Sequence, residues 1–311
     1  MTEPSRPDRA APHPARLAVG VLGAGRVGAV LGAALIRAGH EVVAASGFSR
    51  ASRERAAELL GIDCVDPFEV AARSSLLLLA VPDDALPPLV EALVSAEAVA
   101  PGTLVAHTSG RYGTAVLDPL TRAGALPLAL HPVMTFTGTR VDLARLAGAC
   151  FGITAPEPLR PVAEALVVEM GADPQWVAEE HRVLYHAALA NSANHLVTLV
   201  AQSADLLAVA GVENPSRLLG PLLGAALDNA LRSGDHALTG PVARGDSGTV
   251  GAHVTAIAGQ SPEAAAAYVA MARLTADRAL AAGLLDSTRA ADLLEVLRRR
   301  HPFERAEGGD R

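Results

Sequence analysis

The sequence predicts an α/β protein of two domains, in which a doubly wound parallel sheet is followed by an all-helical domain. Three observations lead to this fold class. A glycine-rich turn joins an apolar strand to a helix near the N-terminus. Short apolar runs then alternate with helical patterns over roughly the first 175 residues. Beyond Val177 the pattern changes to long helical stretches rich in Ala and Leu.

The chain of 311 residues is long for one core and comfortable for two domains. The apolar run Leu76–Val81 is much shorter than a membrane helix requires. Cys64 and Cys150 lie far apart in the sequence, as expected in a reducing cytoplasm. We therefore expect a cytoplasmic protein without membrane contact. The expected parts are a disordered tail (1–15), the sheet domain (16–177), the helical domain (178–302) and a second tail (303–311).

The first strand and helix flank three glycines at the spacing G-x-G-x-x-G, the dinucleotide-binding fingerprint of a Rossmann domain. Gly23 permits the tight turn, Gly25 lets the backbone approach phosphate, and Gly28 lets the helix sit close to the strand. The pyrophosphate then meets free N–H groups and the positive end of the helix dipole. The alternative is a tight turn without a ligand. The predicted cofactor-binding segment is Gly23, Ala24, Gly25, Arg26, Val27 and Gly28.

The second strand, Glu41–Ala45, indicates which dinucleotide binds. An NAD site usually places an Asp or Glu on the ribose about twenty residues after the glycines. Here Ser46–Arg50 carries hydroxyls and a guanidinium, and Arg53 follows one turn later. Ser49 and Arg50 therefore predict NADP, because a guanidinium binds phosphate oxygens that a carboxylate would repel. The alternative is that Arg50 and Arg53 are solvated helix residues.

Later strands should bring polar residues to one edge of the sheet. Ligands bind at the carboxyl ends of parallel strands, so Val81, Pro82 and Asp83 are expected against the nicotinamide half of the cofactor. The alternative is a capped helix start, with Asp83 or Asp84 at the N-cap. Ser109 and His131 follow two further strands and are expected at the same edge. The expected strands are 62–65, 75–80, 103–106, 126–130 and 150–154, with a helix over 158–170.

The second half carries little aromatic bulk, since aromatic residues form only 3% of the chain. Close packing through alanine, including packing against a second subunit, should compensate for the small side chains. We therefore expect a homodimer. The expected helices are about 180–210, 215–233, 247–258, 262–282 and 286–300.

Two segments of the helical half differ from ordinary core sequence. Segment 185–195 carries two asparagines one turn apart, the second of them Asn194, which need a ligand or interhelical hydrogen bonds if they are buried. A tight polar loop holds Thr239 and Arg244, which suit substrate binding. Alternatively, Asp246 caps the next helix and Arg244 pairs with it.

Charge and composition exclude several functions. The net charge of −7 and the scattered arginines argue against a nucleic-acid partner. All 26 basic residues are arginine, so Schiff-base chemistry and a P-loop lysine are excluded. No spacing of His, Cys, Asp and Glu predicts a metal site.

Several motifs together resemble one family, the Rossmann-like proteins that carry a C-terminal domain of unknown function. That family is similar to pyrroline-5-carboxylate reductases, ketopantoate reductases and deazaflavin-dependent NADP reductases, which implies a helical domain of the 6-phosphogluconate dehydrogenase type. The chain departs from the ketopantoate and hydroxyacid enzymes, which use a helix lysine where this sequence has His186 or Ala190. The motifs are Gly23–Gly28, His107–Gly110, His131–Pro132 with Thr135–Phe136, Tyr185–His186 with Asn194, and Leu238–Pro241 with Arg244–Asp246.

We therefore predict an NADP-dependent oxidoreductase that reduces a small keto or imino acid, ketopantoate first. The substrate heteroatom needs a proton from a group that titrates near neutrality, so His131 or His186 is the expected acid, each with a core histidine as the alternative. Asn194 and Thr239 should orient the substrate, and Arg244 should bind its carboxylate. The alternative functions are an NADP-linked reductase of a redox carrier and a non-catalytic NADPH-binding regulator.

Overall fold

The computed structural model describes residues 16–299, so the tails predicted at 1–15 and 303–311 lie outside the described residues. The chain forms two compact units, whose boundary falls between Ser192 and Ala193 inside helix α8 (Arg182–Val209). Each unit has hydrophobic core clusters of its own.

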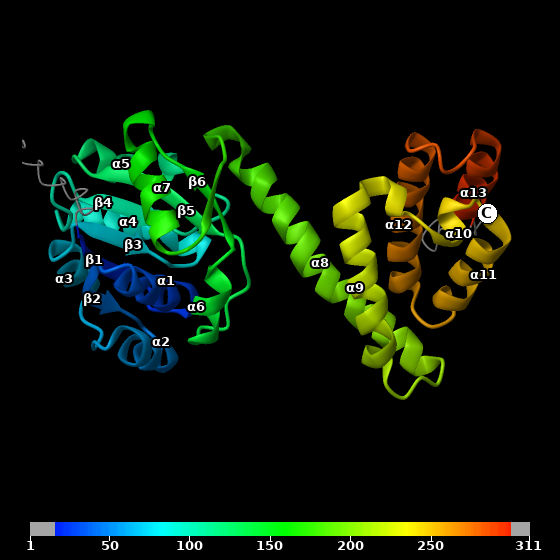
Figure 1. Cartoon of the computed structure of the whole chain (residues 1–311), viewed down its shortest axis with the longest axis horizontal. Helices are drawn as coiled ribbons and strands as arrows, with labels where there is room; N and C mark the ends of the chain where they lie inside the picture. The colour runs from blue at the N-terminus through cyan, green and yellow to red at the C-terminus, as the bar shows by residue number, and fades with distance from the viewer. Residues whose placement is uncertain (1–15, 300–311) are drawn as a thin grey trace, which may run out of the picture. The chain divides into compact units, whose positions relative to one another are not determined.

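A seven-stranded sheet in the order β2-β1-β3-β4-β5-β6-β7 forms the first unit (Figure 1). Neighbouring strands run parallel except β5 and β6, which are antiparallel. The sheet is therefore mostly parallel, and an antiparallel strand near the edge is common in doubly wound folds. The strands are β1 (Ala18–Leu22), β2 (Glu41–Ser46), β3 (Leu76–Leu79), β4 (Leu104–His107), β5 (Leu126–Pro132), β6 (Cys150–Thr154) and β7 (Asp173–Trp176).

Two strand predictions differ from the structure. The strand expected at 62–65 is wrong, because only a single bridge joins Ala45 to Cys64. Asp66 and Pro67 stop the extended segment there, since Asp66 caps the helix that Pro67 begins. Strand β7 was not predicted, because its mostly exposed sequence Asp-Pro-Gln-Trp lacks an apolar pattern.

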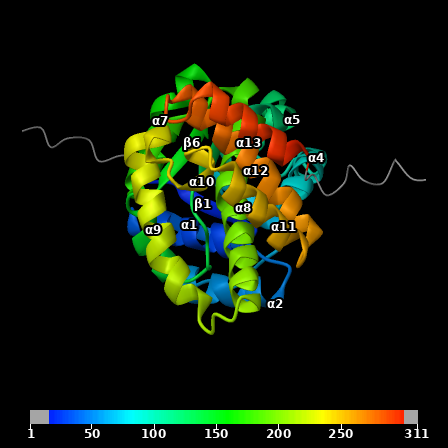
Figure 2. The same ribbon diagram turned by 90° about the vertical axis from the view of Figure 1, so that its right-hand side faces the viewer.

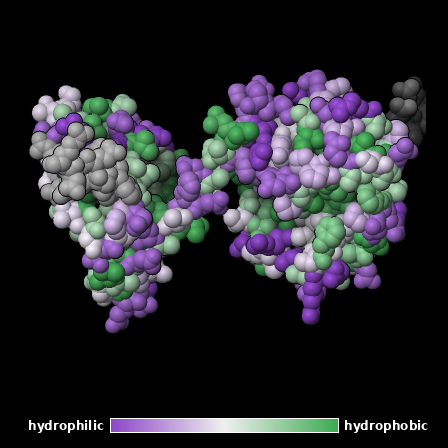
Figure 3. Space-filling view, turned by 180° about the vertical axis from the view of Figure 1, so that it is seen from behind, coloured by the Kyte–Doolittle hydropathy of each residue, from purple (hydrophilic) through white to green (hydrophobic). Residues whose placement is uncertain are grey.

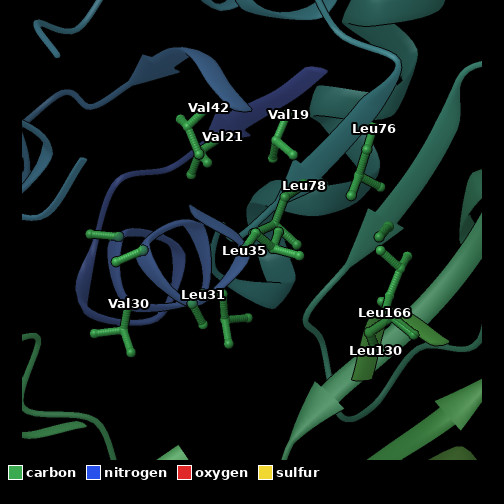
Figure 4. Packing of buried hydrophobic residues seen from close by; sticks show 14 of the residues in the cluster. Val19, Val21, Val30, Leu31, Leu35, Val42, Leu76, Leu78, Leu130 and Leu166 are labelled. Carbon is green, nitrogen blue, oxygen red and sulfur yellow. The ribbon is translucent and has the colours of Figure 1, made fainter. Parts of the chain in front are cut away.

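Helices cover both faces of the sheet. Leu76 and Leu78 of β3 contribute to one core cluster, whereas Leu77 and Leu79 contribute to the other, because successive side chains of a strand alternate. Figure 4 shows Leu35 of α1 beside Leu78. The predicted doubly wound sheet is confirmed. One face is covered by α1 (Arg26–Arg37), η1 (Ala56–Leu60), α6 (Val141–Leu146) and α7 (Arg160–Glu169), and the other by α3 (Pro67–Ala72), α4 (Leu86–Ser95) and α5 (Asp118–Arg122).

Shorter elements link these layers. Helix α2 (Arg50–Arg55) follows β2 and continues into η1, which has a π-helical hydrogen-bond pattern. The short 3₁₀ turns are η2 (Asp83–Ala85), η3 (Thr114–Leu117), η4 (Glu157–Leu159), η5 (Glu179–His181) and η6 (Gly234–Ala237).

The second unit is helical, as predicted. Helices α11, α12 and α13 pack on one another (Figure 2). They enclose a small core in which Val250, Val269 and Leu293 are fully buried. None of the helices within residues 16–299 is both long and apolar enough to cross a membrane. Besides α8, the helices are α9 (Pro215–Ser233), α10 (Gly240–Ala243), α11 (Ser247–Ala258), α12 (Pro262–Ala281) and α13 (Ser287–Arg299).

Candidate active site

The glycine-rich turn between β1 and α1 has a shape that side chains would block. Gly23 has a φ of +94°, and a Cβ there would lie 2.5 Å from the carbonyl oxygen of Ala80. A Cβ at Gly28 would lie 2.9 Å from the Cβ of Ala80, so the helix packs directly on the end of β3. Around Gly25 only one atom lies within 4 Å of the Cβ position, which leaves room for a phosphate.

The first turn of α1 is suited to an anion. It begins at Arg26 with neither a capping side chain nor an acidic residue. The N–H groups of Gly23 and Ala24 donate to the carbonyl oxygen of Ser46 at 3.2 and 2.8 Å. These two residues therefore shape the turn rather than offer their amides to a ligand. The residues present fit a dinucleotide, and the contacts of Arg26, Val27 and the glycines with it stay predictions.

A loop after β5 lies against this turn, which the sequence did not indicate. A Cβ at Gly138 would lie 2.7 Å both from Arg26 Cγ and from Arg55 Nε. The buried carboxylate of Asp142 holds the loop by accepting from the N–H groups of Thr137 and Gly138 at 2.8 and 2.7 Å. Burial alone would raise the pKa of Asp142, but these hydrogen bonds outweigh burial and lower it.

The end of β2 carries hydroxyl and guanidinium groups and no acid. The Ser49 hydroxyl caps α2 by accepting a backbone N–H at 3.1 Å. Arg50 is exposed and pairs with Glu54 at 2.7 Å, whereas Arg53 donates to the carbonyl oxygen of Phe48 at 2.9 Å. Exposed ion pairs of this kind contribute little, so a phosphate can compete for Arg50. The contacts of Ser49 and Arg50 with a 2′-phosphate stay predictions.

The end of β3 leads into Val81, Pro82 and Asp83. The turn η2 starts at Asp83 without a side-chain cap, so the alternative of an Asp83 N-cap is not what the structure shows. The carboxylate of Asp83 raises the pKa values of His107 and His131, against a larger effect of burial. Asp83 therefore belongs to the electrostatic environment of both histidines, and its cofactor contact stays a prediction.

A buried histidine braces the turn after β4. His107 donates from Nε2 to the carbonyl oxygen of Gly113 at 2.8 Å, and its Nδ1 accepts from the Ser109 N–H at 3.2 Å. Burial lowers the pKa of His107 to about 4, so the ring is neutral. Ser109 is buried as well, and its hydroxyl accepts from the Tyr112 N–H at 3.2 Å. Ser109 thus has a structural role, and its cofactor contact stays a prediction.

The two histidines expected as acids lie together with a tyrosine. His131 at the end of β5 has its Nδ1 2.8 Å from the Tyr185 hydroxyl of α8. The rings of His131 and His186 meet edge to face, with centroids 5.7 Å apart. Gly110 packs on both, because a Cβ there would lie 2.6 Å from His186 Cδ2 and 2.9 Å from His131 Nε2. Three separate segments therefore meet at the carboxyl edge of the sheet.

The hydrogen-bonded pair in this cluster is uncharged at neutral pH. Burial lowers the pKa of His131 to about 4, and the positive charge of Arg182 acts in the same direction. Burial raises the pKa of the Tyr185 hydroxyl, which therefore keeps its proton. The pKa of His131 lies below the near-neutral range that its residue type suggests, because the ring is buried. The sequence does not show this burial. A neutral imidazole that is hydrogen-bonded to a protonated phenol can still relay a proton.

The remaining predicted site residues lie in the second unit. Asn194 is exposed on α8, Thr239 occupies the N-cap position of α10, and Arg244 is exposed at the end of that helix. Asp246 caps α11 by accepting from the Thr249 N–H at 3.0 Å, as the capping alternative proposed. The substrate contacts of Asn194, Thr239 and Arg244 stay predictions.

Tyr185 is the side chain of this cluster that the sequence did not single out as a site residue. A lone tyrosine in an apolar helix usually belongs to the core. The sequence signal that could have pointed to Tyr185 is its position beside His186 and one helical turn after Arg182, the first residue of α8.

Models of two known protein families match the N-terminal and the C-terminal part of the chain. Residues 1–132 match the Rossmann-like domain, and residues 149–275 match a domain of unknown function, DUF2520. The chain combines a Rossmann-like domain with a DUF2520 domain. The resemblance found in the motifs is therefore confirmed. No curated protein matches the chain.

Solved structures show the same fold at low sequence identity. A candidate NADP oxidoreductase from Bacteroides fragilis is 21% identical, with a TM-score of 0.70, and the match covers 84% of this chain and 98% of that one. An imine reductase from Pseudomonas sp. is 19% identical, with a TM-score of 0.59 and coverages of 91% and 100%. A pyrroline-5-carboxylate reductase from Coxiella burnetii is 14% identical, with a TM-score of 0.54 and coverages of 92% and 98%.

Proposed function

We propose that this chain is an NADP-dependent oxidoreductase that reduces the C=O or C=N bond of a small keto or imino acid, with ketopantoate the first substrate to test. The cluster of His131, Tyr185 and His186 at the carboxyl edge of the sheet carries the proposal. This is the edge where doubly wound folds bind ligands. The names of two similar structures, an imine reductase and a pyrroline-5-carboxylate reductase, support the reaction class.

The glycine-rich turn supports the cofactor. The open space at Gly25 and the uncapped start of α1 suit a pyrophosphate, while Ser49 and Arg50 suit a 2′-phosphate. When bound, the reduced nicotinamide supplies a hydride to the substrate carbon.

The proton comes from the Tyr185–His131 pair. The substrate oxygen or nitrogen gains negative charge as its carbon is reduced, so it must take up a proton. The O–H bond of Tyr185 breaks as the new O–H or N–H bond forms. His131 then stabilises the phenolate through Nδ1–H at 2.8 Å until the tyrosine regains a proton from water.

A homodimer is part of the proposal. Helix α8 has its apolar residues spread around its surface, and Arg182 is its only residue buried in the described chain. A helix that is apolar all round is normally buried, so a second copy of the chain is the expected cover. Figure 3 shows apolar side chains at the surface among polar ones. The exposed apolar residues of α8 and α9 include Leu196, Val197, Leu199, Leu218, Leu222, Leu227 and Leu231.

The decisive experiment compares nucleotide binding by calorimetry in the wild type and in two arginine variants. Arg50→Ala should weaken NADPH binding about tenfold or more and leave NADH binding unchanged, because only NADPH carries the 2′-phosphate. Arg122→Ala removes an exposed arginine of α5 and should change neither affinity. NADPH absorbance is then followed with ketopantoate, other 2-keto acids and cyclic imino acids.

Turnover with any member of this panel would establish the reductase and its substrate class. Tight NADPH binding without turnover would favour the redox-carrier reductase or the regulator. Absence of binding to either nucleotide would overturn the interpretation of Gly23, Gly25 and Gly28.

A further inference from the structure

Arg182 is a buried arginine without an acidic partner. It is 1% exposed at the start of α8. Its guanidinium donates to the carbonyl oxygens of Tyr112 at 2.8 Å, Gly152 at 3.1 Å and Ser109 at 2.8 Å. Within residues 16–299, no carboxylate lies within 4.0 Å of it. Because arginine is rarely buried without a counter-ion, this arrangement calls for an explanation.

An acidic residue one helical turn before Arg182, Glu179, is engaged elsewhere. Glu179 accepts from the backbone N–H groups of Thr114 at 2.7 Å and Ala115 at 3.2 Å. The hydrogen bonds of the guanidinium therefore go to carbonyl dipoles, and its positive charge acts on the groups around it.

The three carbonyl groups tie the first turn of α8 to the sheet. Two belong to the turn after β4, and the third belongs to Gly152 of β6. Tyr185 follows one turn later, and its ring centroid lies 5.5 Å from Cζ of Arg182. A Cβ at Gly152 would collide with the Tyr185 hydroxyl, so β6 leaves space for that group. The position of the Tyr185 hydroxyl relative to His131 therefore depends on Arg182.

Four other ionisable residues act on the pKa of His131. Arg182, His186 and His107 lower its pKa, whereas Asp83 raises it. Arg182 is the one member of this set with a permanent positive charge. The same charge lowers the pKa of Tyr185 against the larger effect of burial, and so favours its phenolate.

We infer that Arg182 is a positioning residue, which holds the Tyr185 hydroxyl on His131 and stabilises the phenolate left after proton transfer. This inference rests on the proposed function for its catalytic consequence. Its two structural parts, the charge and the three hydrogen bonds, are separable by substitution.

The test uses the full-length chain with Arg182→Gln, which removes the charge, and Arg182→Lys, which keeps the charge and loses the planar fork. Arg160→Gln is the matched control, because it neutralises an exposed arginine that stacks on Trp176. NMR titration without nucleotide should show the pKa of His131 rising above its value of about 4 in Arg182→Gln, while burial still keeps it below that of a free imidazole. It should stay near the wild-type value in Arg182→Lys and in the control. Circular dichroism and NADPH calorimetry confirm that each variant folds.

With the best substrate of the panel, both Arg182 variants should lose at least about tenfold in kcat with little change in KM, because a misplaced catalytic group affects the transition state. An unchanged pKa of His131 in a folded Arg182→Gln would overturn the inference, and so would wild-type kcat in both variants. If the wild type turns over no substrate while the pKa shifts as expected, the electrostatic part of the inference stands and the proposed function fails.

Discussion

Gly110 offers a direct test of the histidine cluster. A Cβ introduced by Gly110→Ala would lie 2.6 Å from His186 Cδ2 and 2.9 Å from His131 Nε2. Ordinary van der Waals contact begins near 3.4 Å, so the two rings must retreat by about 0.8 Å and about 0.5 Å, the differences from that limit. The backbone of Gly110 is not left-handed, so the effect of the substitution comes from this clash and not from backbone strain.

A retreat of this size is large for a catalytic group. Because His131 also forms the 2.8 Å hydrogen bond to Tyr185, a shift of its ring by about 0.5 Å would disturb the geometry of that bond. Catalytic groups need placement within about 0.5 Å, and an error of 1 Å can cost about 100-fold. We expect kcat to fall about 10- to 100-fold. Overpacking should also lower the free energy of unfolding by about 1–3 kcal/mol.

The assay follows NADPH oxidation with the best substrate, beside NADPH calorimetry and chemical denaturation. The control Gly248→Ala places a methyl group where the nearest atom, Asp246 Oδ1, is 3.8 Å away, and it should leave kcat unchanged. Wild-type kcat in Gly110→Ala, together with an unchanged titration of His131, would show that these rings do not act in the reaction.

Three further predictions concern stability and assembly. Acid should destabilise the fold as pH falls from about 6.5 to about 4. In this range His107 and His131 take up protons in the unfolded chain but stay neutral in the folded chain, where their pKa values are about 4. Denaturation across this range measures the slope, which His107→Gln should reduce. Asp142→Asn should lower the free energy of unfolding by about 1–3 kcal/mol and weaken NADPH binding in calorimetry. An unchanged affinity for NADPH would show that the loop held by Asp142 does not contribute to cofactor binding. Light scattering should give a dimer for the wild type and a monomer for Leu222→Glu combined with Leu231→Glu, whereas a wild-type monomer would refute the dimer.

Local patterns in the sequence determined the fold class. The glycine spacing predicted a tight turn, in which Gly23 has a positive φ, and a helix that lies close to the preceding strand at Gly28, because those constraints act between residues near one another in the sequence. Continuous apolar residues predicted the central strand Leu76–Leu79, which is buried on both faces. Helical periodicity placed α9 and α11 with the bounds that the structure has.

Contacts between distant segments decided the chemistry of the candidate site. His131 and Tyr185 are 54 positions apart, and no local pattern shows that they share a hydrogen bond. Arg182 and Ser109 are 73 positions apart, so the buried arginine becomes visible only when α8 meets the turn after β4. Burial itself depends on these contacts and sets the low pKa of His131. The sequence alone therefore determined which residue types reach the sheet edge, while tertiary packing decided their partners and protonation, because desolvation and charge act through space.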